Sequence, residues 1–542
     1  MADEVVEMLR EAAREALPPL EGELSLPGLA GPVEVARDQW GVPHIYAENL
    51  LDLFRAQGFV TAADRYFQIE LLSRYSLGSL SELIGALTLP LDRFIRTLGW
   101  PSIAARHVAG WDDASHEQVA ALWEGVAAWR EQMPAPPVEY AILEADPWVP
   151  TAETGKLATA GFSLLLGYTL TRNWDAELLR AEVAEKVGVD AMVDLFPDCV
   201  NLPAFIQAGK STHPARAELL ANAFLPTSGQ GSNNWVVSGA RSATGKPLLA
   251  NDPHLAILCP AMWYECHLSA PGLHAAGASL PFAPGIVIGH NERIAWGVTD
   301  TESDVSDLYL ERLSEDGNSA EYQGKMEALT TREEVIAVRD SDPVVLAVKE
   351  SRHGPLLDSY LIGIADPVAI EGGITKSYAL RWVAADRAVH PSCLTKVNRA
   401  ANWEEFRAAL SDWECPGLNW VYADVDGNIG YQLWGRHPVR NAGDGTVPVP
   451  GWTDEFEWVG NVPSAELPWA FNPPENFLCN ANNKAHHDSY PHLLTKDFLP
   501  PYRVLRIAEL LCATEKHTVE SFAAIQQDTV SLAVREVLPY LL

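Results

Sequence analysis

Cysteine is scarce in this chain, which has seven cysteines among 542 residues. They are odd in number and widely scattered, no two form a Cys-x-x-Cys pair, and none has the spacing of zinc ligands. These features argue against a disulfide framework or a zinc-stabilised fold. Most of the thiols are therefore expected to be buried as small hydrophobic groups.

Basic residues are also few. Lys and Arg number 39 against 72 Asp and Glu, which gives a formal net charge of −33. Such an excess of negative charge repels phosphate backbones and anionic lipid headgroups. Neither a nucleic acid nor a membrane surface is expected as a partner. The hydrophobic share of 47% is typical of a globular chain with several cores and argues against disorder.

Long hydrophobic runs are absent. The longest, Leu157 to Leu170, is interrupted by Gly and Thr and falls short of the ~20 residues that a spanning helix needs. The start, Met1 to Leu20, carries charges at helical intervals and lacks the apolar region of a secretory signal. No membrane span is expected. The chain as it stands is expected in the cytoplasm, or in the periplasm or outside the cell if its N-terminus was trimmed.

Common hydrolase and metal motifs are missing as well. There is no Gly-x-Ser-x-Gly nucleophile elbow and no His-Glu-x-x-His. The adjacent His486 and His487 would point apart on a helix or strand. The run from Asp424 to Gly427 lacks the glutamate that closes a calcium loop, so we interpret it as a hairpin turn.

The residues that are present divide the chain in two. Short strands are expected at Val33–Ala36 and His44–Ala47, followed by amphipathic helices from Leu50 to about residue 223. From Ser232 to about residue 460, short strands alternate with turns. The further strands are predicted at Lys246–Ala250, Gly285–Ile288, Arg293–Gly297, Leu308–Leu313, Val335–Arg339, Val344–Glu350, Tyr378–Trp382, Trp420–Asp424 and Ile429–Trp434.

This pattern predicts an α+β protein with a helical region 1–231 and a sheet-rich region 232–542. Because no long helix separates the strands, the sheets are expected to be antiparallel. The helices before residue 223 and after residue 500 should then cover their outer faces.

Ser232 stands at the boundary between the two regions. It follows the breaker-rich loop Leu225 to Gly231 and precedes a run of bulky, strand-forming residues. Its hydroxyl is well placed to attack the carbonyl of Gly231 in an N→O acyl shift, and hydrolysis of the ester would free its amine. An α-amine has a pKa of about 7.7–8.0, so part of it is neutral at pH 7 and can act as a base for the same residue's hydroxyl. Taken alone, the Gly231-Ser232-Asn233 sequence is more typical of a turn.

Several other segments change that interpretation. In this order along the chain, they resemble the penicillin-acylase family, which includes penicillin, cephalosporin and acyl-homoserine-lactone acylases. The resemblance covers about residue 30 to the end. The segments are Arg37-Asp38-Gln39-Trp40-Gly41-Val42-Pro43-His44-Ile45, Gln57 to Arg65, Gly231-Ser232-Asn233-Asn234-Trp235, Leu249-Ala250-Asn251-Asp252-Pro253-His254, Gly289 to Gly297, Asp304-Val305-Ser306-Asp307 and Asn480-Ala481-Asn482-Asn483.

The resemblance implies a four-layer αββα sandwich of the N-terminal-nucleophile hydrolases, with a helical N-terminal subunit. It implies cleavage between Gly231 and Ser232, which makes an α/β heterodimer from one precursor. Ser232 matches the nucleophile. The backbone N–H groups of His254 and Asp300 and the side-chain amide of Asn482 match the oxyanion donors. Arg503 matches an arginine that orients this asparagine and the amine.

The resemblance also implies a structural Ca²⁺ ion. Asp304, the carbonyl of Ser306 and Asp307 match its ligands, and Glu177 is a candidate ligand from the helical half. A further carboxylate after Asn482 has no counterpart, because Leu493 and Leu494 lie near its place. The alternative is a pair of exposed acids in an acidic chain.

An acyl pocket is expected at Leu255, Ile288 and Val298, whose aliphatic side chains suggest an aliphatic acyl group. Glu302, close to them in sequence, does not fit an oily pocket. Family members usually extend beyond the position of Leu542, so the resemblance also implies that the chain is either a fragment or a shortened variant, and in both cases later sheet elements are expected to be missing.

The favoured hypothesis is hydrolysis of linear amides in acylated small molecules, such as penicillins or N-acyl-homoserine lactones, through an acyl-enzyme on Ser232 and without an organic cofactor. A catalytically inactive scaffold or binding protein is one alternative. A serine esterase that stays uncleaved and pairs Ser232 with a histidine is another.

Overall fold

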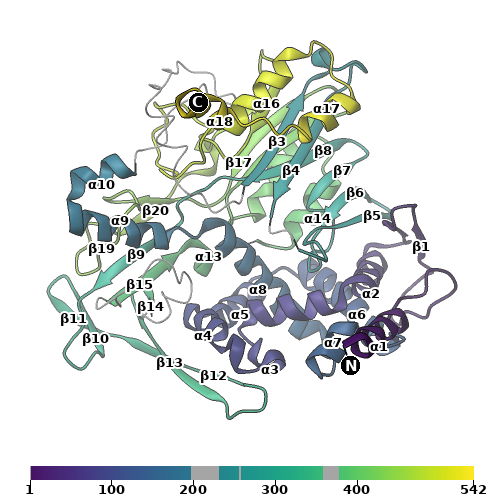
Figure 1. The fold of residues 1–542 in the computed structure, drawn as a ribbon, viewed down its shortest axis with the longest axis horizontal. Helices are drawn as coiled ribbons and strands as arrows, with labels where there is room; N and C mark the ends of the chain where they lie inside the picture. Colours follow the sequence, from purple (N-terminus) through teal and green to yellow (C-terminus); the bar gives the residue numbers. More distant parts are fainter. Residues whose placement is uncertain (1, 197–230, 256–257, 358–376, 388) are drawn as a thin grey trace.

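The computed structural model describes residues 2–196, 231–255, 258–357, 377–387 and 389–542. Within them a helical first half precedes a sheet-rich second half, which confirms the α+β class (Figure 1). The loop Leu225 to Gln230 before Gly231 and the helix expected up to residue 223 lie outside the described residues.

The first half starts with α1 (Ala2–Glu15) and a hairpin of β1 (Glu34–Arg37) and β2 (Pro43–Tyr46). The long helix α2 (Leu50–Leu77) begins where the side chain of Asn49 accepts a hydrogen bond from the Asp52 amide at 2.9 Å. It ends at Gly78, whose φ of 60° is left-handed. The remaining helices are α3 (Ser81–Ile84), α4 (Leu89–Leu98), α5 (Trp100–Ala109), α6 (Asp113–Gln132), α7 (Val138–Leu143), α8 (Ala152–Thr171), α9 (Trp174–Val187) and α10 (Val189–Leu195).

A nine-stranded sheet forms the centre of the molecule, in the order β1-β2-β5-β6-β7-β8-β16-β17-β21. Its other strands are β5 (Tyr264–Ala270), β6 (Leu273–Ser279), β7 (Ile288–Asn291), β8 (Ile294–Asp300), β16 (Leu418–Asp424), β17 (Ile429–Trp434) and β21 (Trp469–Phe471). All its pairs are antiparallel, as the sequence predicts, except β2 with β5. That parallel pair joins the N-terminal hairpin to the sheet.

A smaller sheet in the order β22-β3-β4 carries Ser232. Its strands are β3 (Gly231–Val237), β4 (Leu248–His254) and β22 (Phe477–Asn480). On one face Trp235 packs with Val504 of α16 (Tyr502–Ala513) and Phe522 of α17 (Val519–Gln526). On the other face Val236 packs with residues of β16 and β17. Because side chains alternate along a strand, Ser232 shares the face of Val236 and points toward the large sheet.

The opposite face of the large sheet is covered by helices. Trp296 and Trp420 share a core with residues of α2, α8, α14 (Ser392–Arg399) and α15 (Trp403–Ala409). Three cores therefore separate four layers: α16 and α17, the small sheet, the large sheet, and the second set of helices. This arrangement confirms the αββα sandwich, with α16 and α17 at the top of Figure 1 and α2, α6 and α8 near the bottom.

A third sheet flanks the sandwich in the order β12-β13-β14-β15-β9-β19. The hairpin of β10 with β11 and the two-stranded sheet of β18 with β20 lie beside it. These strands are β9 (Ser306–Glu311), β10 (Ser319–Tyr322), β11 (Lys325–Ala328), β12 (Thr330–Ile336), β13 (Val344–Ser351), β14 (Gly354–Leu357), β15 (Ser377–Trp382), β18 (Pro438–Arg440), β19 (Val449–Pro450) and β20 (Trp458–Asn461). Helices α13 (Val383–Asp386) and α18 (Leu532–Leu541) complete the described elements, apart from short 3-10 turns.

The strand expected at Gly285–Ile288 is wrong, because β7 begins only at Ile288. The side chain of Gln57 in α2 takes the place of a neighbouring strand there. It accepts a hydrogen bond from the Gly285 amide at 3.1 Å and donates to the Ala283 carbonyl at 3.0 Å. A side chain from a helix in the other half of the chain therefore takes up the hydrogen bonds of the residues before β7. Local sequence cannot indicate such a contact.

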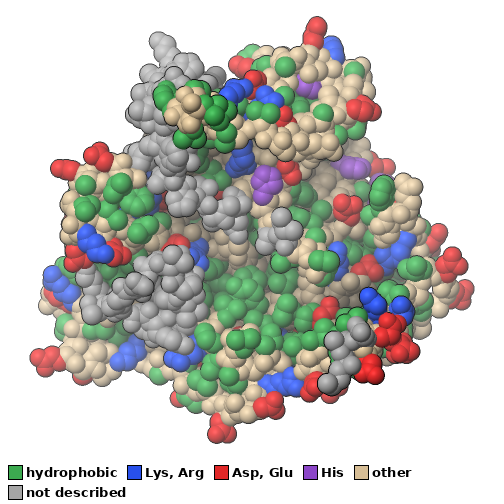
Figure 2. All heavy atoms as spheres, viewed as in Figure 1, with side chains coloured by type: hydrophobic (Ala, Val, Ile, Leu, Met, Phe, Trp, Pro, Cys, Tyr) green, Lys and Arg blue, Asp and Glu red, His purple; other side chains and the backbone are tan. Residues whose placement is uncertain are grey.

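The acidic surface and the burial of most described cysteines agree with what the composition predicts. Figure 2 shows acidic side chains spread around the edge of the viewed face. Of the six cysteines in the described part of the chain, Cys266, Cys393, Cys415 and Cys479 are buried, and Cys259 and Cys512 are exposed. No described helix combines the length and apolar character needed to cross a bilayer.

Candidate active site

Ser232 is held by its backbone. Its N–H donates to Oδ1 of Asn482 at 2.6 Å, and its carbonyl accepts from Nη1 of Arg503 at 2.7 Å. The N–H and carbonyl of Ser232 therefore both point away from β4. The residue opposite Ser232 in β4 is Pro253, which has no N–H to donate. Because antiparallel pairs alternate, Gly231 and His254 form the next hydrogen-bonded pair. The backbone N–H of His254 thus faces the carbonyl of Gly231.

Arg503, in the first turn of α16, fixes the asparagine. Its Nη2 donates to the carbonyl of Ala481 at 2.7 Å and to Oδ1 of Asn482 at 2.9 Å. Burial lowers the pKa of Arg503, and the charges of Glu302 and Asp252 oppose that shift. A Cβ on Gly231 would lie 2.9 Å from Nη2, so only glycine allows the arginine this close.

Asp300 enters the site through its backbone. The amide of Thr301 donates to the carbonyl of Gly417 in the ladder with β16, so by alternation the N–H of Asp300 points away from β16. On the other side of β8, the pairing with β7 ends at Trp296, so β7 does not pair with Asp300. The carbonyl of Asp300 accepts from Nδ2 of Asn482 at 2.8 Å. Its carboxyl lies on the opposite, helical side of the strand, where burial raises its pKa well above the usual range.

The imidazole of His254 lies on the face of the small sheet opposite the Ser232 hydroxyl. Its Nε2 is 3.2 Å from Oδ2 of Asp252 and 3.4 Å from Nδ2 of Asn233. The hydrogen bond from His254 lowers the pKa of Asp252. Both residues line a cavity of about 240 Å³ against α16 and α17. Within the described residues no histidine hydrogen-bonds the Ser232 hydroxyl, so the arrangement offers no histidine base for the esterase alternative.

Asn251, for which the sequence predicted no role, joins the two sheets by hydrogen bonds beside Ser232. Its Nδ2 donates to the carbonyls of Asn233 at 2.9 Å and Val298 at 2.7 Å, and its Oδ1 accepts from the Val298 amide at 2.8 Å. Gly297 leaves room for it, since a Cβ there would lie 2.7 Å from Cβ of Asn251. Asn251 belongs to a motif segment, but only the packing of β4 on β8 reveals its partner.

Among the residues of the expected acyl pocket, Ile288 packs against the same core as Val298. Val298 is buried on the helical side of β8, on the face that also carries Trp296. Ile288 and Leu255 are half-buried. Their grouping as an acyl pocket stays a prediction. Glu302 has a left-handed φ of 55°, and burial raises its pKa to about 7 while nearby Arg503 opposes the shift.

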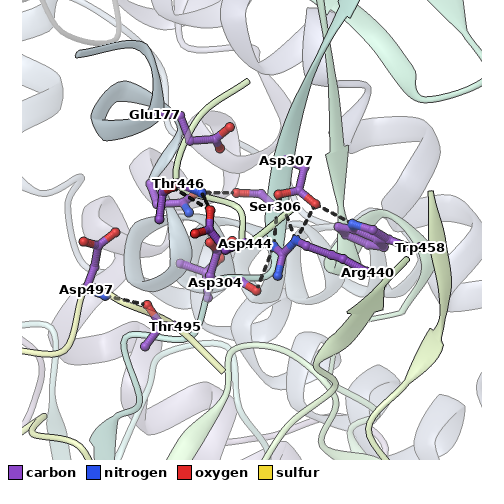
Figure 3. Close-up of polar contacts among 12 residues, drawn as sticks. Glu177, Asp304, Ser306, Asp307, Arg440, Asp444, Thr446, Trp458, Thr495 and Asp497 are labelled. Atoms are coloured by element: carbon purple, nitrogen blue, oxygen red, sulfur yellow. Dashed lines mark hydrogen bonds and ion pairs between the residues drawn. The ribbon is translucent and has the colours of Figure 1, made fainter. Parts of the chain in front are cut away.

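An acidic cluster lies between α9 and β9 (Figure 3). Arg440 pairs with Asp304 at 2.7 Å and with Asp307 at 2.8 Å. Glu177 accepts from the Leu308 amide at 3.2 Å, and its Oε1 is buried without a partner. The hydroxyl of Ser306 donates to Asn173, the residue before α9, at 2.7 Å. These acids are buried, so the alternative of an exposed pair is wrong.

A fourth carboxylate of the cluster was not predicted from the sequence. Asp497, three residues beyond Leu494, lies among these residues (Figure 3) and pairs with Arg180 of α9 at 3.0 Å. The carbonyl of Leu494 itself accepts from the Asp304 amide at 2.9 Å. The loop that follows Asn482 thus places a carboxylate in the cluster, whereas the sequence predicted none near Leu493 and Leu494.

Charge is unbalanced in this cluster. Five carboxylates, Glu177, Asp304, Asp307, Asp444 and Asp497, face three cations, Arg440, Arg180 and Lys496. Burial, with repulsion from neighbouring acids, raises the pKa of Glu177 and Asp304 well above the usual range. As arranged, no three His, Cys, Asp or Glu side chains of the described residues converge on a metal position. The surplus of negative charge and the orphaned Glu177 oxygen nevertheless suit a hard cation.

The αββα layering, with Ser232 at the start of an inner strand, is the architecture of N-terminal-nucleophile hydrolases. Comparison with known proteins gives the family. Residues 32–542 match the family model described as penicillin amidase, and the chain belongs to this family.

Two relatives illustrate the similarity. The chain is 35% identical to the penicillin acylase 2 proenzyme of a Pseudomonas species, over 96% of this chain and 67% of that protein. It is 31% identical to the acyl-homoserine lactone acylase QuiP of Pseudomonas aeruginosa, over 96% of this chain and 63% of that protein. The chain thus spans about two thirds of the length of these relatives.

A solved structure also matches. Thermostable penicillin G acylase from Alcaligenes faecalis is 26% identical, with a TM-score of 0.49 over 57% of this chain and 54% of that chain.

Proposed function

We propose that this chain is a self-processing amidohydrolase that cleaves linear amides of acylated small molecules. The observation that carries the proposal is the position of the Ser232 nitrogen, 2.6 Å from Oδ1 of Asn482, which Arg503 holds in place. An amine freed at this nitrogen stays bound beside its own hydroxyl. The relatives named penicillin acylase and acyl-homoserine lactone acylase support the same chemistry.

In the processing step, the Ser232 hydroxyl attacks the Gly231 carbonyl carbon, and the C–N bond of the peptide breaks as the nitrogen takes up the hydroxyl proton. Water then hydrolyses the resulting ester, which leaves a carboxylate on Gly231 and restores the hydroxyl of Ser232. The N–H of His254 faces the Gly231 carbonyl in the ladder, so it supports the oxyanion of this step. The product is an α/β heterodimer.

In turnover, the free amine of Ser232 accepts the proton of its own hydroxyl, and the oxygen attacks the substrate amide carbonyl. The amine then gives the proton to the leaving nitrogen. The acyl ester forms, and water releases the acid by the same route. The N–H groups of His254 and Asp300 and the amide of Asn482 are the oxyanion donors, and Arg503 keeps Asn482 in position.

Penicillins and N-acyl-homoserine lactones are the proposed substrate classes, with the acyl chain bound near Leu255, Ile288 and Val298. The test is hydrolysis of both classes with graded acyl chains, with Ser232→Ala as the control. We expect acid release from at least one series by the wild type and none by the variant. Equal release by both proteins, or none by cleaved wild type across both series, would reject the proposal.

We also propose that the acidic cluster holds a structural Ca²⁺ ion through Glu177, Asp304, Asp307 and the carbonyl of Ser306. The surplus of carboxylates over cations supports it. The ion would supply positive charge between α9 and β9 and takes no part in the reaction. Metal analysis after dialysis, with thermal unfolding in Ca²⁺ and in a chelator, tests this proposal. Retained calcium and a lower midpoint in chelator are expected, whereas no metal and equal midpoints would mean that Arg440, Arg180 and Lys496 neutralise the cluster without an ion.

A further inference from the structure

Between the two sheets, next to Ser232, lies a set of buried side-chain amides. Asn419 of β16 is its centre, and its side chain is 1% exposed. Its Nδ2 lies 2.9 Å from the Asp300 carbonyl, 3.1 Å from Oγ1 of Thr299 and 3.2 Å from Oδ1 of Asn480. Asn419 is not one of the residues that form the candidate active site.

The other atoms of Asn419 are occupied as well. Its Oδ1 accepts a hydrogen bond from the hydroxyl of Tyr431 in β17, which fixes the orientation of the amide. Its backbone carbonyl accepts from Nδ2 of Asn234 at 3.1 Å, two residues after Ser232 in β3. One residue thus contacts four strands, including the strand of the nucleophile.

These contacts lie on either side of one peptide group, the one that joins Thr299 to Asp300. Oγ1 of Thr299, which Asn419 holds, also donates to Asn480 at 2.7 Å. The Asp300 carbonyl, which Asn419 also holds, accepts a second hydrogen bond from Asn482. The groups on either side of the peptide between Thr299 and Asp300 are therefore fixed, and the N–H of this peptide points away from β16. This N–H is an oxyanion donor under the proposed function.

We propose that Asn419 is a positioning residue that sets the direction of the Asp300 N–H and shares an anchor with Asn482. The inference rests on the proposed function. Because a donor fixed before the reaction needs no reorganisation, its alignment affects the transition state more than the bound substrate. Asn419 therefore acts on kcat through Asp300 and Asn482 and touches no substrate itself.

The sharpest variant is Asn419→Asp, which keeps the shape and replaces the donor with an acceptor. The new oxygen would face two acceptors, the Asp300 carbonyl and Oδ1 of Asn480, and the Thr299 hydroxyl could donate to it only by leaving Asn480. On protein shown by mass to be cleaved before Ser232, we expect kcat to fall about 10-fold to 100-fold with KM changed less than about 2-fold, a milder loss than deleting a donor outright. Tyr431→Phe keeps the amide and frees its Oδ1, so a smaller loss of kcat is expected.

A second readout separates positioning from simple destabilisation. An alkyl boronic acid forms a tetrahedral adduct on a serine hydroxyl and needs the oxyanion donors, whereas the carboxylic acid product does not form one. We expect boronate affinity to fall in step with kcat in both variants and product affinity to stay unchanged. Thr159→Val, which removes the 3.0 Å contact with buried Trp123 in the helical half, is the matched control. It should lower the unfolding midpoint and leave kcat and both affinities unchanged.

Two results would overturn the inference while the proposed function stands: wild-type kcat in Asn419→Asp, or equal weakening of boronate and product. A wild type that stays uncleaved refutes the proposed function itself, and the inference falls with it.

Discussion

At the bond between Gly231 and Ser232, the lack of a side chain on Gly231 allows Arg503 to approach the backbone closely. A Cβ on residue 231 would lie 2.9 Å from Nη2 and 3.3 Å from Oδ1 of Asn482. Gly231→Ala must therefore displace the two groups that hold the Ser232 nitrogen.

We expect Gly231→Ala to slow self-cleavage by about 10-fold or more, since misplacement of reacting groups by a fraction of an ångström is costly. Time-resolved intact-mass measurement on freshly made protein reports the rate. Gly460→Ala is the matched control, because a Cβ there meets nothing within 4 Å. Cleavage of Gly231→Ala at the wild-type rate would contradict this role for the glycine.

His353 shows how a single buried side chain makes stability depend on pH. Its two ring nitrogens lie 2.8 Å from Glu311 and 3.1 Å from Glu457. Burial lowers the pKa of His353, but the hydrogen bonds and charges of the two glutamates outweigh it, so the pKa lies above the ordinary 6.5. A raised histidine pKa stabilises the fold fully below 6.5, and the contribution is lost as pH rises through the folded-state value.

We therefore expect His353→Gln to lose stability at pH 6 and to approach the wild type as the pH rises to about 9. Denaturant unfolding of both proteins across this range measures the difference. His290→Gln, at an exposed position on β7, is the matched control and should differ little in stability from the wild type. A constant gap for His353→Gln would mean that no imidazolium is held between the glutamates.

Among the elements, the crossing of α2 and α6 is set by two glycines. A Cβ on Gly58 would lie 1.8 Å from the carbonyl oxygen of Leu122, and one on Gly125 would lie 1.9 Å from that of Arg55. Each glycine thus faces the backbone of the other helix, and neither position tolerates a methyl group without separating the helices.

Gly58→Ala should destabilise the protein by about 3 kcal/mol, the upper end for overpacking, because backbone cannot rotate away. Thermal or denaturant unfolding measures the change. Gly110→Ala is the control, since Gly110 ends α5 at a negative φ and its nearest contact would be 3.4 Å. Equal stability of Gly58→Ala and the wild type would show that the helices separate at little cost.

The order of elements could be predicted from the sequence, because hydrophobic periodicity and turn residues are local signals. The helical first half, the break at Gly231 and strands such as β13 and β17 follow from them. Which face each side chain takes could not be predicted. His254 lies within a predicted site, yet its imidazole points away from the Ser232 hydroxyl, because strand register decides the face.

Contacts between distant segments were beyond the sequence for the same reason. Asn482 accepts a hydrogen bond from Ser232, 250 positions away in the sequence. Asn251 and Asn419 reach their hydrogen-bond partners only when the two sheets stack. Asp497 was missed because the length of the preceding loop is not fixed by any local pattern. Ser232 and Asn482 were found through the motif segments and Arg503 through the family resemblance, and the structure brings these three together.

At the scale of the whole molecule, the two halves share a core. Phe162 of α8 stacks on Phe282 at 4.5 Å, and Trp100 of α5 lies 6.2 Å from Trp382 of β15. Helices α2 and α8 pack in the same core as the large sheet. Cutting one peptide before Ser232 removes none of these contacts.

We therefore expect the two pieces to elute together on size exclusion in native buffer and to separate only in denaturant. High salt should not part them, because the shared core is apolar and is not screened by ions. Separation of the pieces in native buffer would contradict the shared core.

The central claim is that the peptide before Ser232 is cut so that its amine and hydroxyl act together. Intact mass with N-terminal sequencing of the purified wild type and of Ser232→Ala tests it most directly. The account predicts a wild-type chain that begins at Ser232 and a variant that remains a single uncut chain. A wild type that hydrolyses acyl amides while its only N-terminus is that of the full chain would contradict it.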